Sequence, residues 1–203
     1  MHMIKKYISQ IKKNQGMTYV ELIVVLSIFS VMSSIVIFNY GEFQAKVDMK
    51  NLANDVALKI VEAQKSALSG ILPSVAPYIT PWKPSYGLYF NLNNDNKSFI
   101  YFTDLNNNNI FDTGDCSGEC LGKFSITKEH YISRIDSYTG SVATNIASFP
   151  FTIVFKRPDS SAIFGDPNGV SLSGFDYIQL TLKSPRNDSA QVKIYPSGRI
   201  QIN

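Results

Sequence analysis

Oxygen-bearing side chains recur at regular spacing between Asp104 and Asp115 of this 203-residue chain. The segment reads Asp-Leu-Asn-Asn-Asn-Asn-Ile-Phe-Asp-Thr-Gly-Asp, so oxygen donors fall at its first, third, fifth, ninth and twelfth positions, with the carbonyl of the seventh between them. Alternate residues of a tight coil point toward one centre, and this is the spacing of a calcium-binding loop. The predicted calcium ligands are Asp104, Asn106, Asn108, Ile110, Asp112 and Asp115.

Two positions of this loop depart from the usual calcium pattern. Asn109 stands where glycine normally makes the sharp turn, and asparagine tolerates a left-handed backbone better than most residues. Asp115 stands where a longer, bidentate glutamate is usual, which predicts weaker coordination. The alternative is an asparagine-rich surface turn that binds nothing. The sequence therefore predicts at most a calcium ion that clips the loop, and no required cofactor.

Both cysteines of the chain, Cys116 and Cys120, follow this loop directly. An even number of cysteines in an exported domain favours a disulfide, and the Ser-Gly dipeptide between them can turn the chain. Two cysteines alone make a poor zinc site, and their spacing is not the Cys-x-x-Cys of redox proteins. We expect a disulfide that staples the calcium-like turn, with two free thiols as the alternative.

Sequence motifs of enzymes are missing. The chain contains no Gly-x-Ser-x-Gly, no phosphate-binding glycine-rich loop and no metalloprotease helix motif. Its carboxylates cluster in the calcium-like loop, where they act as predicted ligands. We therefore predict that the protein is not an enzyme.

One further acid, Glu21, stands at the head of residues 22–38, which contain no charge, proline or glycine. As a helix, residues 17–38 would measure about 33 Å, enough to cross the hydrocarbon core of a bilayer. An ionisable group at the edge of such a segment is costly unless paired. An ordinary signal anchor with a stray acid is the alternative. Residues 1–16 carry four lysines and no acid, which orients the N-terminus toward the cytoplasm.

Gly16 followed by Met17-Thr-Tyr-Val-Glu21-Leu and the apolar run resembles the type III signal of type IV pilins and type II secretion pseudopilins. The resemblance implies that a prepilin peptidase removes leader 1–16 by cutting between Gly16 and Met17, and then methylates the new amine. It also implies that Glu21 neutralises the α-amine of a neighbouring subunit in the apolar filament core, where an unpaired charge is disfavoured. Met17 replaces the phenylalanine usual at this position.

Removal of the leader changes the balance of basic and acidic side chains. The chain carries 19 basic and 16 acidic side chains, and 19 less the four leader lysines leaves 15. A near-neutral mature protein does not favour broad electrostatic capture of nucleic acid, so nucleic acid is an unlikely partner.

The elements that would position these residues follow from the pattern of apolar side chains. A helix over 17–70 continues beyond the membrane segment as an amphipathic stripe from Phe43 to Ala67 and stops at Ser69-Gly70. Residues 71–84 form a proline-rich linker in which Trp82 is expected to pin the linker to the head. Residues 85–203 form a β-rich head, giving an α+β, pilin-like fold with two sheets or one strongly bent sheet. The predicted strands are 86–92, 98–103, 130–136, 149–155, 175–183, 190–195 and 199–202.

The head most resembles GspH/FimT-type minor pseudopilins, through Tyr86-Gly-Leu-Tyr-Phe90, the Asp/Asn-rich loop and the closing Tyr195-Pro-Ser-Gly-Arg-Ile200 hairpin. Some members of that family take up DNA through basic residues near the C-terminal Gly-Arg. Here Arg199 is followed by Ile-Gln-Ile-Asn, so a second basic residue is missing and the sequence predicts weak DNA binding at best.

Two classes of function follow from the resemblance. The first is a structural minor pilin or pseudopilin of a type IV pilus or type II secretion-like filament. Major pilins of that family commonly carry a proline or glycine in the membrane half of the helix. This chain has neither between Met17 and Tyr40, so the resemblance favours a pseudopilin or minor pilin. The second is a surface-exposed binding module at a pilus tip, for DNA uptake or adhesion. The implied partners are other pilin subunits, the prepilin peptidase and the inner-membrane assembly platform. The implied location is the bacterial inner membrane, with a single pass and the head outside the cytoplasm, and then the filament.

Overall fold

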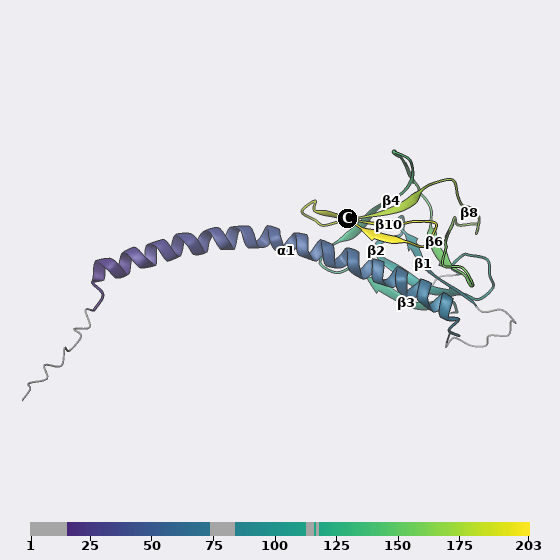
Figure 1. Cartoon of the computed structure of the whole chain (residues 1–203), viewed down its shortest axis with the longest axis horizontal. Helices are drawn as coiled ribbons and strands as arrows, with labels where there is room; N and C mark the ends of the chain where they lie inside the picture. The colour runs from purple at the N-terminus through teal and green to yellow at the C-terminus, as the bar shows by residue number, and fades with distance from the viewer. Residues whose placement is uncertain (1–15, 74–83, 113–115, 117) are drawn as a thin grey trace, which may run out of the picture. The chain divides into compact units, whose positions relative to one another are not determined.

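The computed structural model describes residues 16–73, 84–112, 116 and 118–203. One long apolar helix is followed by a β-rich domain built from two antiparallel sheets (Figure 1). The chain divides into two compact units, Met1–Glu42 and Phe43–Asn203, and the second contains part of the helix and every described strand. The predicted α+β class is confirmed at this level.

Helix α1 spans Tyr19–Ser69 and is slightly shorter at both ends than predicted. It ends because Gly70 adopts a left-handed φ of 58°, which glycine reaches without a steric penalty. The N–H groups of Gly70 and Ile71 then donate to the carbonyl oxygens of Ala67 and Ser66, at 3.0 and 3.3 Å. This pair of bonds satisfies carbonyl groups that the last turn would otherwise leave without partners.

The first sheet, called sheet A here, has six strands in the order β3-β2-β1-β6-β7-β8. Every residue of β6 is buried, as expected for a strand with neighbours on both sides and side chains packed on both faces. The strands are β1 (Ser85–Asn91), β2 (Asp95–Asp104), β3 (Cys120–Ser125), β6 (Phe151–Phe155), β7 (Ala162–Gly165) and β8 (Ser171–Leu172).

The second sheet, called sheet B here, has five strands in the order β11-β10-β9-β4-β5. In β9 and β10 every second side chain is a buried aliphatic one, so one face turns toward the core and the other outward. The strands are β4 (Tyr131–Thr139), β5 (Val142–Asn145), β9 (Tyr177–Lys183), β10 (Ser189–Ile194) and β11 (Ile200–Ile202).

The core of the second unit combines one face of α1 with the inner faces of both sheets. The helix contributes small and medium side chains at three- and four-residue steps, which keeps them on one stripe. Each fully buried large aliphatic or aromatic side chain stabilises the fold by about 1.5–3 kcal/mol. The helix residues in this core include Ala53, Val56, Ile60, Ala63 and Ala67.

The predicted stripe is wrong at its first residue. Phe43 is 64 % exposed, whereas Leu52 packs at the edge of the core. The periodicity of the sequence does not show where the sheets begin to cover the helix, so it extends the buried stripe too far toward the apolar N-terminal part of the helix.

The seven predicted strands correspond to β1, β2, β4, β6, β9, β10 and β11, with ends that differ by a few residues. Strands β3, β5, β7 and β8 are not predicted, because each has six residues or fewer and lacks an aromatic-rich alternating pattern. They form by pairing with longer neighbours. The predicted linker lies mostly outside the described residues, as does Trp82.

Candidate functional site

The predicted cleavage site lies just ahead of helix α1. Gly16 and Met17 are exposed and non-helical, so the bond between them is outside the hydrogen-bonded helix. Thr18 caps the helix, because its hydroxyl accepts a hydrogen bond from the backbone N–H of Glu21 at 3.3 Å. Its carbonyl accepts the N–H of Leu22 at 3.0 Å, which closes the first turn.

Glu21 is exposed in this first turn. Within the described part of the chain, no side chain forms a hydrogen bond or ion pair with its carboxylate. A carboxylate here interacts favourably with the positive end of the helix dipole, by about 0.3–1 kcal/mol. Glu21 therefore supports its own helix while its carboxylate stays available to another molecule.

The helix segment after Glu21 presents large apolar side chains on all sides. Their exposed fractions run from 45 % at Leu22 to 84 % at Phe38. Soluble domains rarely expose so large a continuous apolar surface. This helix is the one, among the described residues, that is long and apolar enough to cross a membrane.

The Asp/Asn loop leaves the end of β2 at Asp104, which is fully buried. The Asp104 carboxylate accepts backbone N–H bonds from Asn108 at 3.1 Å and from Asn109 at 3.0 Å. Asn109 has a left-handed φ of 62°, so the sharp turn forms at the position where a calcium loop normally has glycine. The side chain at the first position of the loop thus binds the backbone of the fifth and sixth positions and closes the turn.

Three of the predicted ligand side chains lie in direct contact. The Asn108 amide donates to both carboxylate oxygens of Asp112, at 3.2 and 3.1 Å, and Asn106 donates to the same carboxylate. The side-chain oxygens of Asn106 and Asn108 accept the N–H groups of Asn108 and Ile110, at 3.1 and 2.8 Å. The amide nitrogens of Asn106 and Asn108 therefore point at the Asp112 carboxylate, and hydrogen bonds within the loop hold all three side chains.

Glu119, which the spacing argument does not identify, ties the two ends of this loop together. Its carboxylate accepts the N–H of Leu105 at 2.8 Å and that of Asp112 at 3.0 Å, and the residue is 5 % exposed. Burial raises the pKa of both the Glu119 and the Asp104 carboxyl groups above their ordinary values, and the backbone donors oppose this rise. The sequence signal for this role was the position of Glu119 between two cysteines that were predicted to pair.

Five of the six predicted calcium ligands lie in the described part of the loop. Among the described residues, no group of three or more histidine, cysteine, aspartate or glutamate side chains is arranged to hold a metal. Asp115, the predicted ligand at the twelfth position, lies outside the described residues. The turn has the predicted form, and calcium stays a prediction.

The Asp/Asn loop folds back over the outer face of sheet A. Phe111 packs against Tyr89 and Phe102, with ring centroids 5.1 and 5.5 Å apart. The Thr152 hydroxyl donates to the Asn109 carbonyl at 3.0 Å. Aromatic packing and a hydrogen bond to β6 therefore fix the loop on the sheet.

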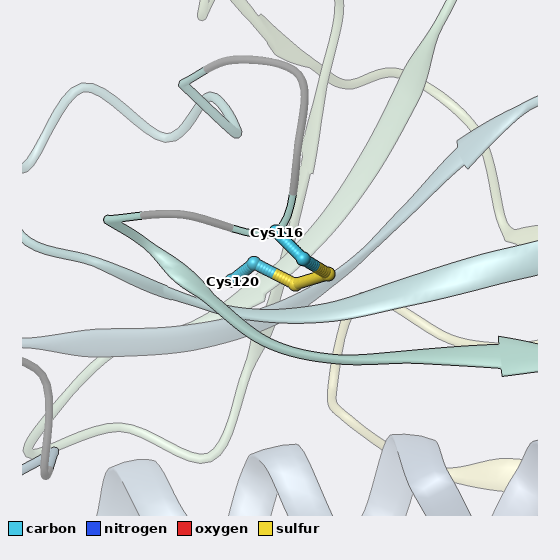
Figure 2. Close-up of a disulfide and its surroundings, with 2 residues drawn as sticks. All are labelled: Cys116 and Cys120. Atoms are coloured by element: carbon cyan, nitrogen blue, oxygen red, sulfur yellow. A yellow bond between two sulfur atoms is a disulfide. The ribbon is translucent and has the colours of Figure 1, made fainter.

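Cys116 and Cys120 lie at disulfide distance, with sulfur atoms 2.00 Å apart (Figure 2). Cys120 is buried at the start of β3, and Cys116 precedes it by four residues. The bridge joins the end of the Asp/Asn loop to the edge of sheet A. It therefore helps to place Glu119, which lies between the two cysteines.

Arg199, the residue expected to contribute weak DNA binding, is exposed just before β11. Its guanidinium carbon lies 3.8 Å from the centroid of the Tyr195 ring. This stacking places Arg199 at the end of a row of tyrosines on sheet B.

Comparison with models of protein families, with curated proteins and with solved structures finds no match to this chain.

Proposed function

We propose that this chain is a structural minor pilin or pseudopilin of a type IV pilus or type II secretion-like filament. The observation that carries the proposal is an exposed apolar helix, long enough to span a bilayer, with one exposed carboxylate at its head. Exposing this apolar surface to water would be unfavourable for a purely soluble domain. A membrane, and then a filament core, would bury it.

The first step of the proposed pathway is insertion of residues 17–38 into the inner membrane, with the β-rich head outside the cytoplasm. A prepilin peptidase then cuts between Gly16 and Met17 and methylates the Met17 amine. The exposed, non-helical backbone at this junction is consistent with access by a peptidase. The assembly platform of the inner membrane would then extract the processed subunit.

The second step is pairing of Glu21 with the amine of a neighbouring subunit. An unpaired carboxylate in an apolar filament core costs several kcal/mol, and a charged partner offsets that cost. Glu21 suits this role because no described residue of its own chain occupies its carboxylate. The Glu21 carboxylate also interacts favourably with the dipole of its own helix. The experiment must separate this local role from pairing with a neighbouring subunit.

The experiment compares Glu21→Gln with Thr18→Ala in cells that assemble the filament. Glu21→Gln keeps the size of the side chain but removes its charge, whereas Thr18→Ala removes the helix cap and keeps the charge. We expect both variants to be cleaved and inserted in the membrane, and only Glu21→Gln to be lost from the sheared filament fraction. Incorporation of Glu21→Gln at the wild-type level would contradict the charge-pairing role.

A calcium clip in the head is a second, separate proposal. It is supported by the left-handed turn at Asn109 and by the two N–H bonds to Asp104, which give the loop the coil that a calcium loop needs. The ion would stabilise the ionised Asp104 and Asp112, with Asn106, Asn108 and the Ile110 carbonyl as neutral donors. Its expected role is stability, since the loop is fixed on the sheet.

The alternative function, a surface-exposed binding module at a filament tip, concerns the head. Within the described head, the outer face of sheet B supports this alternative, because cationic side chains lie against tyrosine rings there.

A further inference from the structure

Four residues form a straight row across the outer face of sheet B. Tyr138 of β4 stands opposite Tyr177 of β9 in the strand register. Extending the pairing of β9, β10 and β11 by one residue places Tyr195 opposite Tyr177 on one side and Arg199 on the other. The Tyr195 N–H donates to the Arg199 carbonyl at 2.9 Å, which confirms that register. We call these four residues the tyrosine row.

The rings in this row pack against one another. Tyr138 and Tyr177 stack with centroids 4.8 Å apart and planes inclined by only 12°. The Tyr177 and Tyr195 rings follow with centroids 5.4 Å apart and planes inclined by 45°, and the Arg199 guanidinium lies over the Tyr195 ring at 3.8 Å. Rings stacked along the cross-strand direction stand upright on the sheet and present edges and hydroxyl groups to solvent.

Cationic side chains accompany the row. Outward positions on these strands, judged from alternation, hold Arg134, Lys183 and Lys193, and the Lys193 ammonium lies 4.9 Å from the Tyr177 centroid. With Arg199 they make four cations on one face. The acid among these outward positions is Asp136, whose side chain is 5 % exposed and whose charge is paired with Arg134 at 2.8 Å. The face is therefore positively charged.

The remaining outward side chains are amides and hydroxyl groups. Gln191 and Gln201 lie beside Lys193 in the register, and Gln201 accepts a hydrogen bond from the Tyr195 hydroxyl at 3.2 Å. Alternation directs the aliphatic residues of β9 and β10 into the core instead. The core of a protein–protein interface is depleted of charged residues such as lysine, whereas this face carries four cations, so a protein partner fits it less well.

From this arrangement we propose that the outer face of sheet B binds an acidic polysaccharide. Lys193 and Arg199 contact carboxylate groups of the polymer, while Gln191, Gln201 and the tyrosine hydroxyls contact its sugar hydroxyls. A single-stranded nucleic acid fits less well, because bases stack on open aromatic faces, whereas Tyr138 covers one face of Tyr177 and Arg199 covers one face of Tyr195.

Stacking prepares the two cations for binding. Each is held against a tyrosine ring, so less side-chain freedom is lost when a carboxylate approaches. The rings therefore act as positioning residues for the charges. This role predicts that removing a ring weakens binding even when the net charge stays the same.

The test measures retardation of the full-length protein, in a non-ionic detergent, on gels that contain polygalacturonate, a neutral glucan or no polymer. The wild-type protein should be retarded by polygalacturonate alone, and less so as salt rises because exposed charges are screened. The double variant Lys193→Gln with Arg199→Gln should lose affinity at least tenfold. Tyr195→Leu should lose affinity severalfold at unchanged charge. Lys65→Gln, an exposed lysine of α1, should bind like the wild type.

Three results would overturn the proposal. The first is no retardation by polygalacturonate at low salt. The second is equal loss in Lys65→Gln and in the double variant, which would indicate non-specific attraction. The third is tighter binding of an oligothymidylate or of an acidic protein in the same assay, which would identify a different partner. Circular dichroism of each variant shows that a loss of binding is not a loss of folding. If the double variant unfolds, Lys193→Gln alone replaces it and should lose affinity severalfold.

Discussion

Gln64 on helix α1 donates its side-chain N–H to the carbonyl oxygen of Gly198 at 3.2 Å, and also to that of Ser160 at 2.8 Å. Gly198 lies in the turn between β10 and β11 and has a left-handed φ of 82°. A Cβ at this position would overlap the Ser160 carbonyl oxygen and the Gln64 amide nitrogen. The helix, this turn and the loop before β7 therefore meet at a point that only glycine fits.

Gly198→Ala should consequently destabilise the head more than a left-handed backbone alone would explain. The left-handed conformation costs a residue with a Cβ about 1–2 kcal/mol, and the overlap with Gln64 and Ser160 adds to this cost. Urea unfolding followed by circular dichroism measures the difference. Gly140→Ala is the matched control, because Gly140 has a φ of 59° and its Cβ would meet nothing within 4 Å. Equal losses in the two variants would show that the contact with the helix is unimportant.

The bridge between Cys116 and Cys120 should contribute modestly to global stability. For so short a closed loop, the loss of disorder in the unfolded chain amounts to about 2 kcal/mol. The double variant Cys116→Ser with Cys120→Ser should lose about that free energy of unfolding. Reductant should lower the wild-type value by the same amount and leave the variant unchanged. Two reactive thiols in the native protein purified under oxidising conditions would refute the staple.

Millimolar calcium should raise the melting temperature of the wild-type protein, because the ion would neutralise carboxylates that are buried or crowded in the loop. Asp104→Asn should abolish this rise, since it removes a charge while keeping an acceptor for the backbone N–H groups. Asp166→Asn is the control, because Asp166 also accepts two backbone N–H bonds but in the turn between β7 and β8. A rise that survives Asp104→Asn would place any bound calcium elsewhere.

Asp95 should make the head sensitive to acid. Hydrogen bonds from the Ser98 hydroxyl, the Lys123 ammonium and the Lys97 backbone lower the pKa of this carboxyl group to about 2, from 3.8. A depressed pKa in the folded state means that the stabilisation is present above the unfolded value and is lost as pH falls toward 2. Asp95→Asn should therefore flatten the fall in unfolding free energy between about pH 4 and pH 2. Ser98→Ala should flatten it in part, and an unchanged pH profile in both variants would contradict this assignment.

Features that depend on neighbours along the chain were predictable from the sequence. The apolar run, the basic segment ahead of it and Glu21 between them are local patterns, as is the Ser69-Gly70 stop that the left-handed Gly70 confirms. The spacing of the Asp/Asn loop likewise predicts a turn at Asn109, because a coil of this kind is closed by hydrogen bonds over only a few residues. Seven strands were found from their aromatic, alternating pattern.

Only the tertiary structure decided which distant residues meet. Glu119 closes the Asp/Asn loop because strand pairing places the start of β3 beside the end of β2. The tyrosine row exists because the registers of four strands bring one tyrosine or arginine from each to the same level. Strands β5 and β7 form by pairing with β4 and β6. A local pattern carries its own geometry, whereas strand register depends on the packing of all strands against α1 and on each other, and no short segment of the sequence contains that information.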